Sequence, residues 1–186
     1  MLNINDLKRG SLIVLDGEPH RVIFTKHTHM GRGSASLQAK VKNLINGKVL
    51  DRGFKPADEF EEAELEKADS IFIYSRNDEF WFHEVGNPAS RFSINKEAIG
   101  EQADFLKSNM EVRAVRFKEK IINVELPIKV DYIVKEAPPN VRGNTAQGGT
   151  KQVTLETGAK ISTPMFVEIG DKIRVNTETR EYVERA

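Results

Sequence analysis

The chain has 186 residues and no formal net charge, with 28 Lys and Arg against 28 Asp and Glu, and it contains no cysteine. The absence of cysteine excludes a disulfide framework, a thiol nucleophile and a cysteine-ligated metal site, and it fits a reducing cytoplasm. Residues 1–55 hold 10 basic and 4 acidic side chains, and the other 131 residues hold 18 and 24. This asymmetry predicts that the amino-terminal third faces a polyanion. Nucleic acid fits better than a membrane, because the chain has no long apolar run, basic amphipathic helix or signal peptide.

Short strand patterns recur along the chain and are separated by turn dipeptides such as Asp16-Gly17, Asn46-Gly47 and Asn77-Asp78. Asn-Gly and Asp-Gly tolerate the positive φ angles of tight hairpins. The sequence therefore predicts an all-β protein. In chain order, the expected strands are residues 11–15, 21–26, 36–43, 48–54, 71–76, 79–85, 111–117, 121–126, 130–136, 152–155, 160–161, 165–168, 172–176 and 181–184.

One segment has helical spacing. From Asn95 onward, Ile99, Ala103 and Leu106 fall at i, i+4 and i+7, and Ser93 is available as a cap. A single helix within a run of strands is typical of a plug on a small barrel.

Two breaks in composition divide the chain. The acidic run at residues 58–66 follows the basic third, and Leu126-Pro127 ends the next set of strands. We therefore expect three domains, at residues 1–64, 65–127 and 128–186. Each piece of about 60 residues is close to the lower limit for an independent core, which a small closed barrel can provide.

The first basic hairpin is the strongest functional signal. Its expected tip carries Arg32 between Gly31 and Gly33. The glycines have no Cβ atoms to keep a partner away, and the guanidinium supplies five donors that do not deprotonate. This pattern therefore predicts that the Arg32 guanidinium enters a narrow binding site formed by phosphate and sugar groups. An ordinary solvated glycine turn is the alternative.

The arms of this hairpin carry further polar groups. Leu37, Ala39 and Val41 alternate with polar residues, which predicts a strand with one buried and one cationic face. The residues expected to hold an RNA backbone without reading its sequence are Lys26, His27, His29, Lys40 and Lys42. Met30 and Ser34 complete the tip loop.

No catalytic constellation stands out. The glycine-rich loop 143–150 has Gly149 where a phosphate-binding P-loop needs lysine, and a strand rather than a helix follows it. His27 and His29 lack a third ligand, so we expect no metal site. Of Phe80, Trp81 and Phe82, we expect at least two in the core, although such a cluster can also stack on bases. The sequence therefore predicts a protein that is not an enzyme.

A resemblance covers essentially the whole chain. Residues 151–171, which read KQVTLETGAKISTPMFVEIGD, resemble the carboxy-terminal signature of bacterial elongation factor P in their spacing of lysine, glycine, proline and aliphatic residues. Residues 182–185 are similar to the terminal Tyr-x-x-Arg of this family, and residues 77–81 to its second-domain hairpin. The similarity continues through residues 98–100 to the tip at residues 31–33.

The resemblance implies an L-shaped protein with an SH3-like (KOW-type) barrel followed by two OB-type barrels. Such factors act as monomers in the cytoplasm. They bind both ribosomal subunits between the peptidyl and exit sites and relieve stalling at consecutive prolines by positioning peptidyl-tRNA. Arg32 takes the tip position that reaches toward the CCA end. The resemblance implies two further groups of RNA contacts. The first is an exit-site loop that faces the messenger and consists of Gly143, Asn144, Thr145, Gln147 and Gly148. The second is the carboxy-terminal pair Tyr182 and Arg185.

The tip departs from the commonest family pattern, which has lysine where this chain has Arg32. Arginine excludes the β-lysyl extension made on lysine-type factors. Arginine-type relatives can carry a rhamnose, added to the guanidinium by a tip-modifying enzyme, but their tip context differs from residues 30–33 here, so a modified and an unmodified Arg32 are both open. No other cofactor is expected. Asn144 and Gln147 also replace residues that are usually Asp and Gly. The alternative function is a stand-alone OB-type RNA-binding protein or RNA chaperone.

Overall fold

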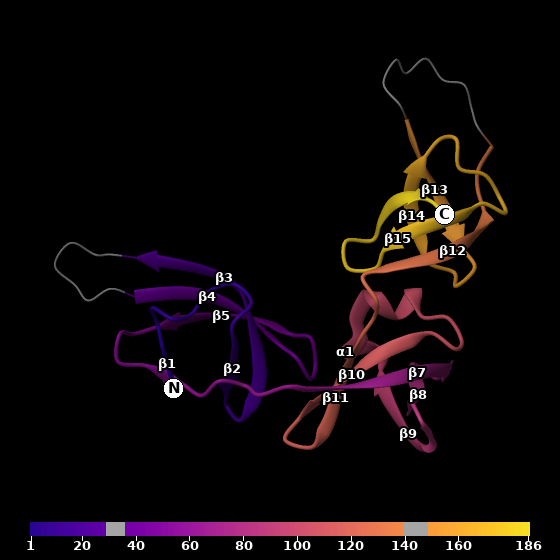
Figure 1. Cartoon of the computed structure of the whole chain (residues 1–186). Helices are drawn as coiled ribbons and strands as arrows, with labels where there is room; N and C mark the ends of the chain where they lie inside the picture. The colour runs from indigo at the N-terminus through magenta and orange to yellow at the C-terminus, as the bar shows by residue number, and fades with distance from the viewer. Residues whose placement is uncertain (29–35, 140–148) are drawn as a thin grey trace.

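The computed structural model describes residues 1–28, 36–139 and 149–186. Its strands form three larger sheets in chain order, and one short helical segment accompanies the second sheet (Figure 1). The first sheet and the third sheet extend in different directions from the second, which lies at the corner of an L (Figure 1). The predicted all-β class with a single short helix is confirmed.

The first sheet has the order β2-β3-β4-β5, and a two-stranded pair, β1 with β6, lies beside it. Its core includes the fully buried Ile13, Val22, Leu37 and Val41. The β2–β3 turn has φ angles of 53° at Asp16 and 81° at Gly17, as the Asp-Gly dipeptide predicts. The strands are β1 (Leu2–Asn3), β2 (Leu12–Leu15), β3 (Glu18–Thr28), β4 (Ser36–Asn43), β5 (Val49–Phe54) and β6 (Glu59–Phe60).

The second sheet has the order β11-β10-β7-β8-β9. Its last strand, β9, was not predicted, because Pro88 and several polar residues hide its pattern; proline is tolerated there because β9 lies last in the sheet order. β7 also begins five residues earlier than expected, where Glu66 to Ser70 pair with β10. The strands are β7 (Glu66–Arg76), β8 (Glu79–Glu84), β9 (Asn87–Asn95), β10 (Glu111–Phe117) and β11 (Lys120–Glu125).

The predicted helix is present but divided. It consists of α1 (Lys96–Ile99) and a 3₁₀ segment, η1 (Gly100–Phe105), with Gly100 at a φ of 72° between them. Ile99, Ala103 and Leu106 are buried as predicted. The predicted cap is wrong: Ser93 lies within β9, and Asn95 is the N-cap residue without a side-chain capping bond. The strand continues to Asn95 because β9 remains paired with β8 up to that residue.

The third sheet has the order β14-β13-β12-β15-β16. The strand predicted at residues 165–168 is wrong, since the chain turns there: the Val167 amide donates to the Pro164 carbonyl at 3.2 Å, and Gly170 follows with a φ of 87°. Val167 is fully buried without being in a strand, which explains its apolar pattern. The strands are β12 (Lys129–Glu136), β13 (Thr150–Leu155), β14 (Lys160–Pro164), β15 (Lys172–Asn176) and β16 (Glu181–Arg185).

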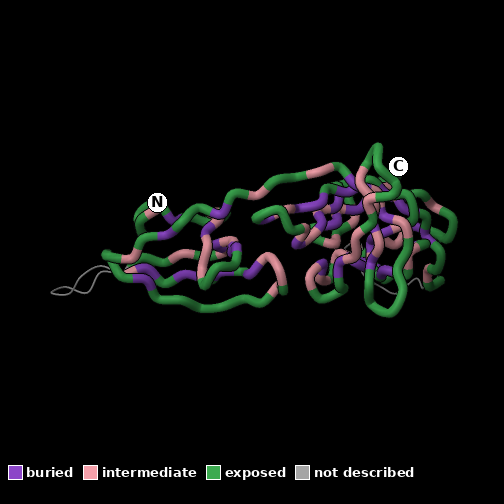
Figure 2. The backbone as a smooth tube through the Cα atoms, turned by 90° about the horizontal axis from the view of Figure 1, so that it is seen from below, coloured by how far each residue is buried: buried purple, intermediate pink, exposed green. Residues whose placement is uncertain are grey.

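The expected domain boundaries at residues 64 and 127 fall between β6 and β7 and between β11 and β12. Seen at right angles to the first view, the amino-terminal sheet lies at one end and the other two sheets overlap at the other (Figure 2). Most buried apolar residues of the second and third sheets form one continuous cluster together with the helical segment. A smaller cluster joins the first sheet to the second: Ala63, Val115, Phe117 and Ile122 pack with Leu12, Val14, Leu44, Ile45 and Leu65.

Candidate nucleic-acid interface

The exposed face of the first sheet is built by strict alternation along β4. Leu37, Ala39 and Val41 are buried, and the residues between them, Gln38 and Lys40, are exposed. Successive side chains of a strand point to opposite faces of the sheet, so the core fixes which residues meet solvent. The predicted division into a buried and a polar face is confirmed for this strand.

The neighbouring strand, β3, contributes its own side chains to this face. Lys26 lies opposite Gln38, and Phe24 lies opposite Lys40. Both β3 residues are exposed. His27 lies opposite the buried Leu37 and is itself exposed near the end of the strand.

The lysines of this face are largely free of intramolecular partners. Lys26 and Lys42 make no ion pair within residues 1–28, 36–139 and 149–186. Lys40 has its Nζ 3.9 Å from an Asp51 carboxylate oxygen, and both side chains are more than half exposed. Such an exposed pair contributes about 0–1 kcal/mol, so Lys40 remains available to a polyanion. Arg21 is engaged with Glu125 of the second sheet at 3.6 Å.

Two groups of predicted site residues lie outside the described residues. They are His29, Met30, Gly31, Arg32, Gly33 and Ser34 of the tip, and Gly143, Asn144, Thr145, Gln147 and Gly148 of the glycine-rich loop. The described residues that flank the tip, Thr28 and Ser36, lie opposite each other in the β3–β4 register. β3 ends and β4 begins at the end of the first sheet that lies away from the second sheet (Figure 1).

Tyr182 and Arg185 lie on β16. The Tyr182 ring is half-buried and packs edge-on against Phe166, with 6.4 Å between ring centroids. The Arg185 guanidinium donates to the Asp171 carboxylate. A hydrogen bond from the Glu168 amide and the one from Arg185 lower the pKa of Asp171. Arg185 therefore has a partner inside its own domain, and its contact with RNA stays a prediction.

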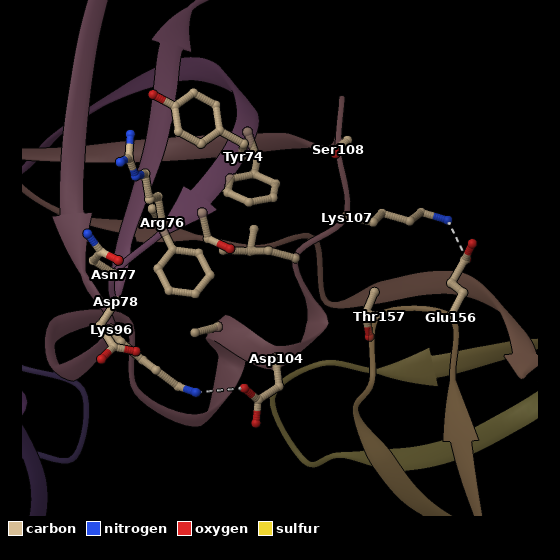
Figure 3. Close-up of a pocket in the computed structure, with 15 residues that line it drawn as sticks. Tyr74, Arg76, Asn77, Asp78, Lys96, Asp104, Lys107, Ser108, Glu156 and Thr157 are labelled. Atoms are coloured by element: carbon tan, nitrogen blue, oxygen red, sulfur yellow. Dashed lines mark hydrogen bonds and ion pairs between the residues drawn. The ribbon is translucent and has the colours of Figure 1, made fainter. Parts of the chain in front are cut away.

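The sequence did not reveal a hollow of about 580 Å³ where the second sheet meets the third (Figure 3). Two ion pairs lie in its walls. The Nζ of Lys96 is 3.2 Å from an Asp104 carboxylate oxygen, and the Nζ of Lys107 is 3.3 Å from a Glu156 carboxylate oxygen. Tyr74 on β7 also lines it. Its lining residues come from three separate stretches, 72–80, 96–108 and 156–157, so no local motif marks it.

The aromatic cluster on β8 is divided between core and surface. Phe80 and Phe82 are buried, as predicted for two of the three rings. Trp81 stacks on Tyr74, which is 44% exposed, with 6.2 Å between centroids and 17° between ring planes. Tyr74 is the exposed member of this pair.

The described part of the chain contains no group of three His, Asp or Glu side chains placed to hold a metal ion. It also contains no helix that is long and apolar enough to span a membrane.

The fold and this interface define a class: an all-β protein of three larger sheets, the first of which presents a cationic face. Two family models match the chain, "Elongation factor P (EF-P) KOW-like domain" over residues 3–60 and "Elongation factor P, C-terminal" over residues 130–185. The chain belongs to the elongation factor P family. It is a translation factor rather than an enzyme, and membership of this family implies interaction with the ribosome.

Curated relatives named "Elongation factor P" match over their full length. The relative from Synechococcus sp. (strain JA-3-3Ab) is 38% identical over 185 residues, and that from Thermotoga petrophila is 39% identical over 186 residues. Each alignment covers 100% of both chains. Among solved structures, the eukaryotic translation initiation factor 5A from Methanococcus jannaschii is similar with a TM-score of 0.47 and 16% identity, covering 66% of this chain and 94% of that one.

Proposed function

We propose that this factor binds the ribosome between the peptidyl and exit sites and stimulates peptide-bond formation, relieving stalling at consecutive prolines. The observation that carries the proposal is the exposed, largely unpaired lysine face on the two strands that lead to Arg32. Family membership supplies the ribosome as the setting. The lysines hold the backbone of peptidyl-tRNA, and Arg32 reaches the acceptor end.

The mechanism needs no acid, base or nucleophile from the factor. Contacts with phosphate and 2′-hydroxyl groups hold the peptidyl-tRNA in a reactive pose, and the ribosome performs the transfer. Well-oriented intramolecular reactions gain on the order of 7–11 kcal/mol. Recovering roughly 1.4 kcal/mol already gives a tenfold rate, so a modest gain in orientation is enough to relieve a stall.

The factor must be rigid if the tip of the first domain and the third domain are to contact the ribosome at the same time. The continuous core of the second and third sheets supports this, and so does the smaller cluster at the junction of the first and second sheets. At the latter junction, Glu125 also pairs with Arg21 at 3.6 Å and with Lys67 at 2.7 Å. We infer that the three domains hold the tip at a fixed distance from the third domain.

The remaining contacts follow from the family resemblance. The loop at residues 143–148 faces the messenger in the exit site on the small subunit, and Tyr182 and Arg185 add carboxy-terminal RNA contacts. Arg32 makes this an arginine-type factor, and a dedicated enzyme adds a rhamnose to its guanidinium. The factor acts as a monomer in the cytoplasm.

Substitution of Arg32 tests this function. Arg32→Ala should leave the thermal melting temperature unchanged and remove most read-through of a polyproline reporter. Arg32→Lys separates charge from shape, because an ammonium keeps the charge but loses the planar fork. Unchanged read-through in Arg32→Ala at unchanged stability would refute the role of the tip. The intact mass of the tryptic peptide that contains Arg32, purified from the native host, tests for the sugar.

A further inference from the structure

Phe24 occupies an unexpected position on the exposed face of the first sheet. Its side chain is 48% exposed, whereas Val22, two residues earlier on β3, is fully buried. Residues i and i+2 of a regular strand share a face. The pairing of β3 with β4 shifts register between Val22 and Phe24, and an inserted residue of this kind re-aims the side chains that follow it. The bulge therefore turns an aromatic ring out to solvent.

The ring lies among cations. Lys40 lies directly opposite Phe24 on β4, and Lys26 follows two residues later on β3. Lys42 stands on the same face of β4, two residues from Lys40. Asp51, opposite Lys40 on β5, is the acidic residue of this row. Three lysines against one aspartate leave the surroundings of the ring positive.

We propose that Phe24 and these lysines form a binding site for an unpaired segment of RNA, with one base stacked on the ring and its phosphates held by the lysines. The proposal deepens the proposed function and rests on it, since that function already turns this sheet toward RNA. Every base has a π-face, so stacking on an aromatic side chain tolerates any sequence. The lysines supply attraction to phosphate without base readout.

The combination selects among forms of RNA. In a duplex the base faces are covered by neighbouring base pairs, so an aromatic ring gains little there, whereas unpaired bases can be splayed out and stacked on it. Lysines alone would bind both forms. Phe24 therefore determines a preference for unpaired nucleotides, and the charge around it disfavours an apolar protein surface as the occupant.

The test uses the full chain and two labelled RNAs of equal length, an oligoadenylate single strand and a fully paired duplex, with fluorescence anisotropy as the readout. We expect the parent to prefer the single strand. Phe24→Ala should weaken single-strand binding by about fivefold or more and change duplex binding by less than about twofold. Phe24→Tyr, which keeps an aromatic ring, should retain the preference.

Two controls separate stacking from charge and from general damage. Ile169→Ala shortens an apolar side chain that is 64% exposed on the third domain and should leave both affinities unchanged. Lys42→Ala should weaken the binding of both RNAs equally and reduce the salt dependence of that binding. Thermal melts of all variants should agree with the parent, because Phe24 is half exposed and its loss opens no cavity.

Equal binding of both RNAs by the parent, or an equal loss on both RNAs in Phe24→Ala, would overturn the inference. A polyproline translation assay separates this result from the proposed function. Relief of stalling without single-strand preference would refute only the Phe24 site, and single-strand preference without relief of stalling would refute only the proposed function.

Discussion

The Tyr132 hydroxyl donates a hydrogen bond of 2.7 Å to the backbone carbonyl of Phe105, across the junction of the third and second sheets. Both side chains are fully buried, and their rings lie 6.0 Å apart between centroids. Lys107 covers the Tyr132 ring with its Nζ 5.1 Å from the centroid. Tyr132 is therefore a central element of the rigid corner of the L.

Removal of this hydroxyl should weaken the corner. Tyr132→Phe keeps the ring but leaves a buried carbonyl without its donor, which costs about 1–3 kcal/mol of the free energy of unfolding. Urea denaturation measures the loss. Tyr74→Phe is the matched control, because Tyr74 is 44% exposed. Equal midpoints for the two variants would show that the hydrogen bond contributes nothing to stability.

Stability should also fall at alkaline pH because of Tyr132. Burial, with a smaller contribution from Glu156, raises the pKa of its phenol well above the ordinary value of 10.0. The unfolded chain therefore releases this proton near pH 10 while the folded protein retains it. The stabilisation is complete below about pH 10 and is lost as pH rises further. The free energy of unfolding of Tyr132→Phe should depend less steeply on pH above about 10 than that of the parent, and identical slopes would contradict this assignment.

The lysine face should govern ribosome binding. Lys40→Glu combined with Lys42→Glu replaces attraction to phosphate by repulsion, so affinity should fall and its salt dependence should flatten. Sedimentation with ribosomes at several salt concentrations measures both. The control pair, Lys129→Glu with Lys160→Glu, changes the net charge equally at exposed positions of the third domain. If the two double variants lose affinity equally, the effect belongs to net charge and not to this face.

The junction between the first and second sheets should be required for relief of stalling. Phe117 is 8% exposed and packs in the small cluster there, so Phe117→Ala removes contacts that hold the two sheets at a fixed angle. We expect a loss of roughly 3 kcal/mol in stability and a marked fall in polyproline read-through. Small-angle scattering should show a broader range of dimensions than in Phe166→Ala. Full read-through from a loosened Phe117→Ala would show that a fixed angle is unnecessary.

Much of the architecture follows from local pattern. Strict alternation in residues 36–43 predicted β4 with its correct bounds and its buried face, because successive side chains of a strand point to opposite faces of the sheet. Residues 111–117 and 172–176 were likewise predicted with the bounds of β10 and β15. The spacing of Ile99, Ala103 and Leu106 identified the buried side of the helical segment. The errors lie where tertiary pairing overrides composition, as in the polar strand β9 and the buried turn around Val167.

The sequence by itself determined the fold class, the uneven distribution of charge and the family, since all three follow from composition, from the alternation of apolar and polar residues, and from motif spacing. Only the tertiary structure decided that Phe24 is exposed, that Arg185 is paired with Asp171, and that the second and third sheets share one core. These features depend on register and on residues far apart in the chain. A single shifted pair in a β-ladder exchanges core and solvent faces, and no local periodicity records where that shift occurs.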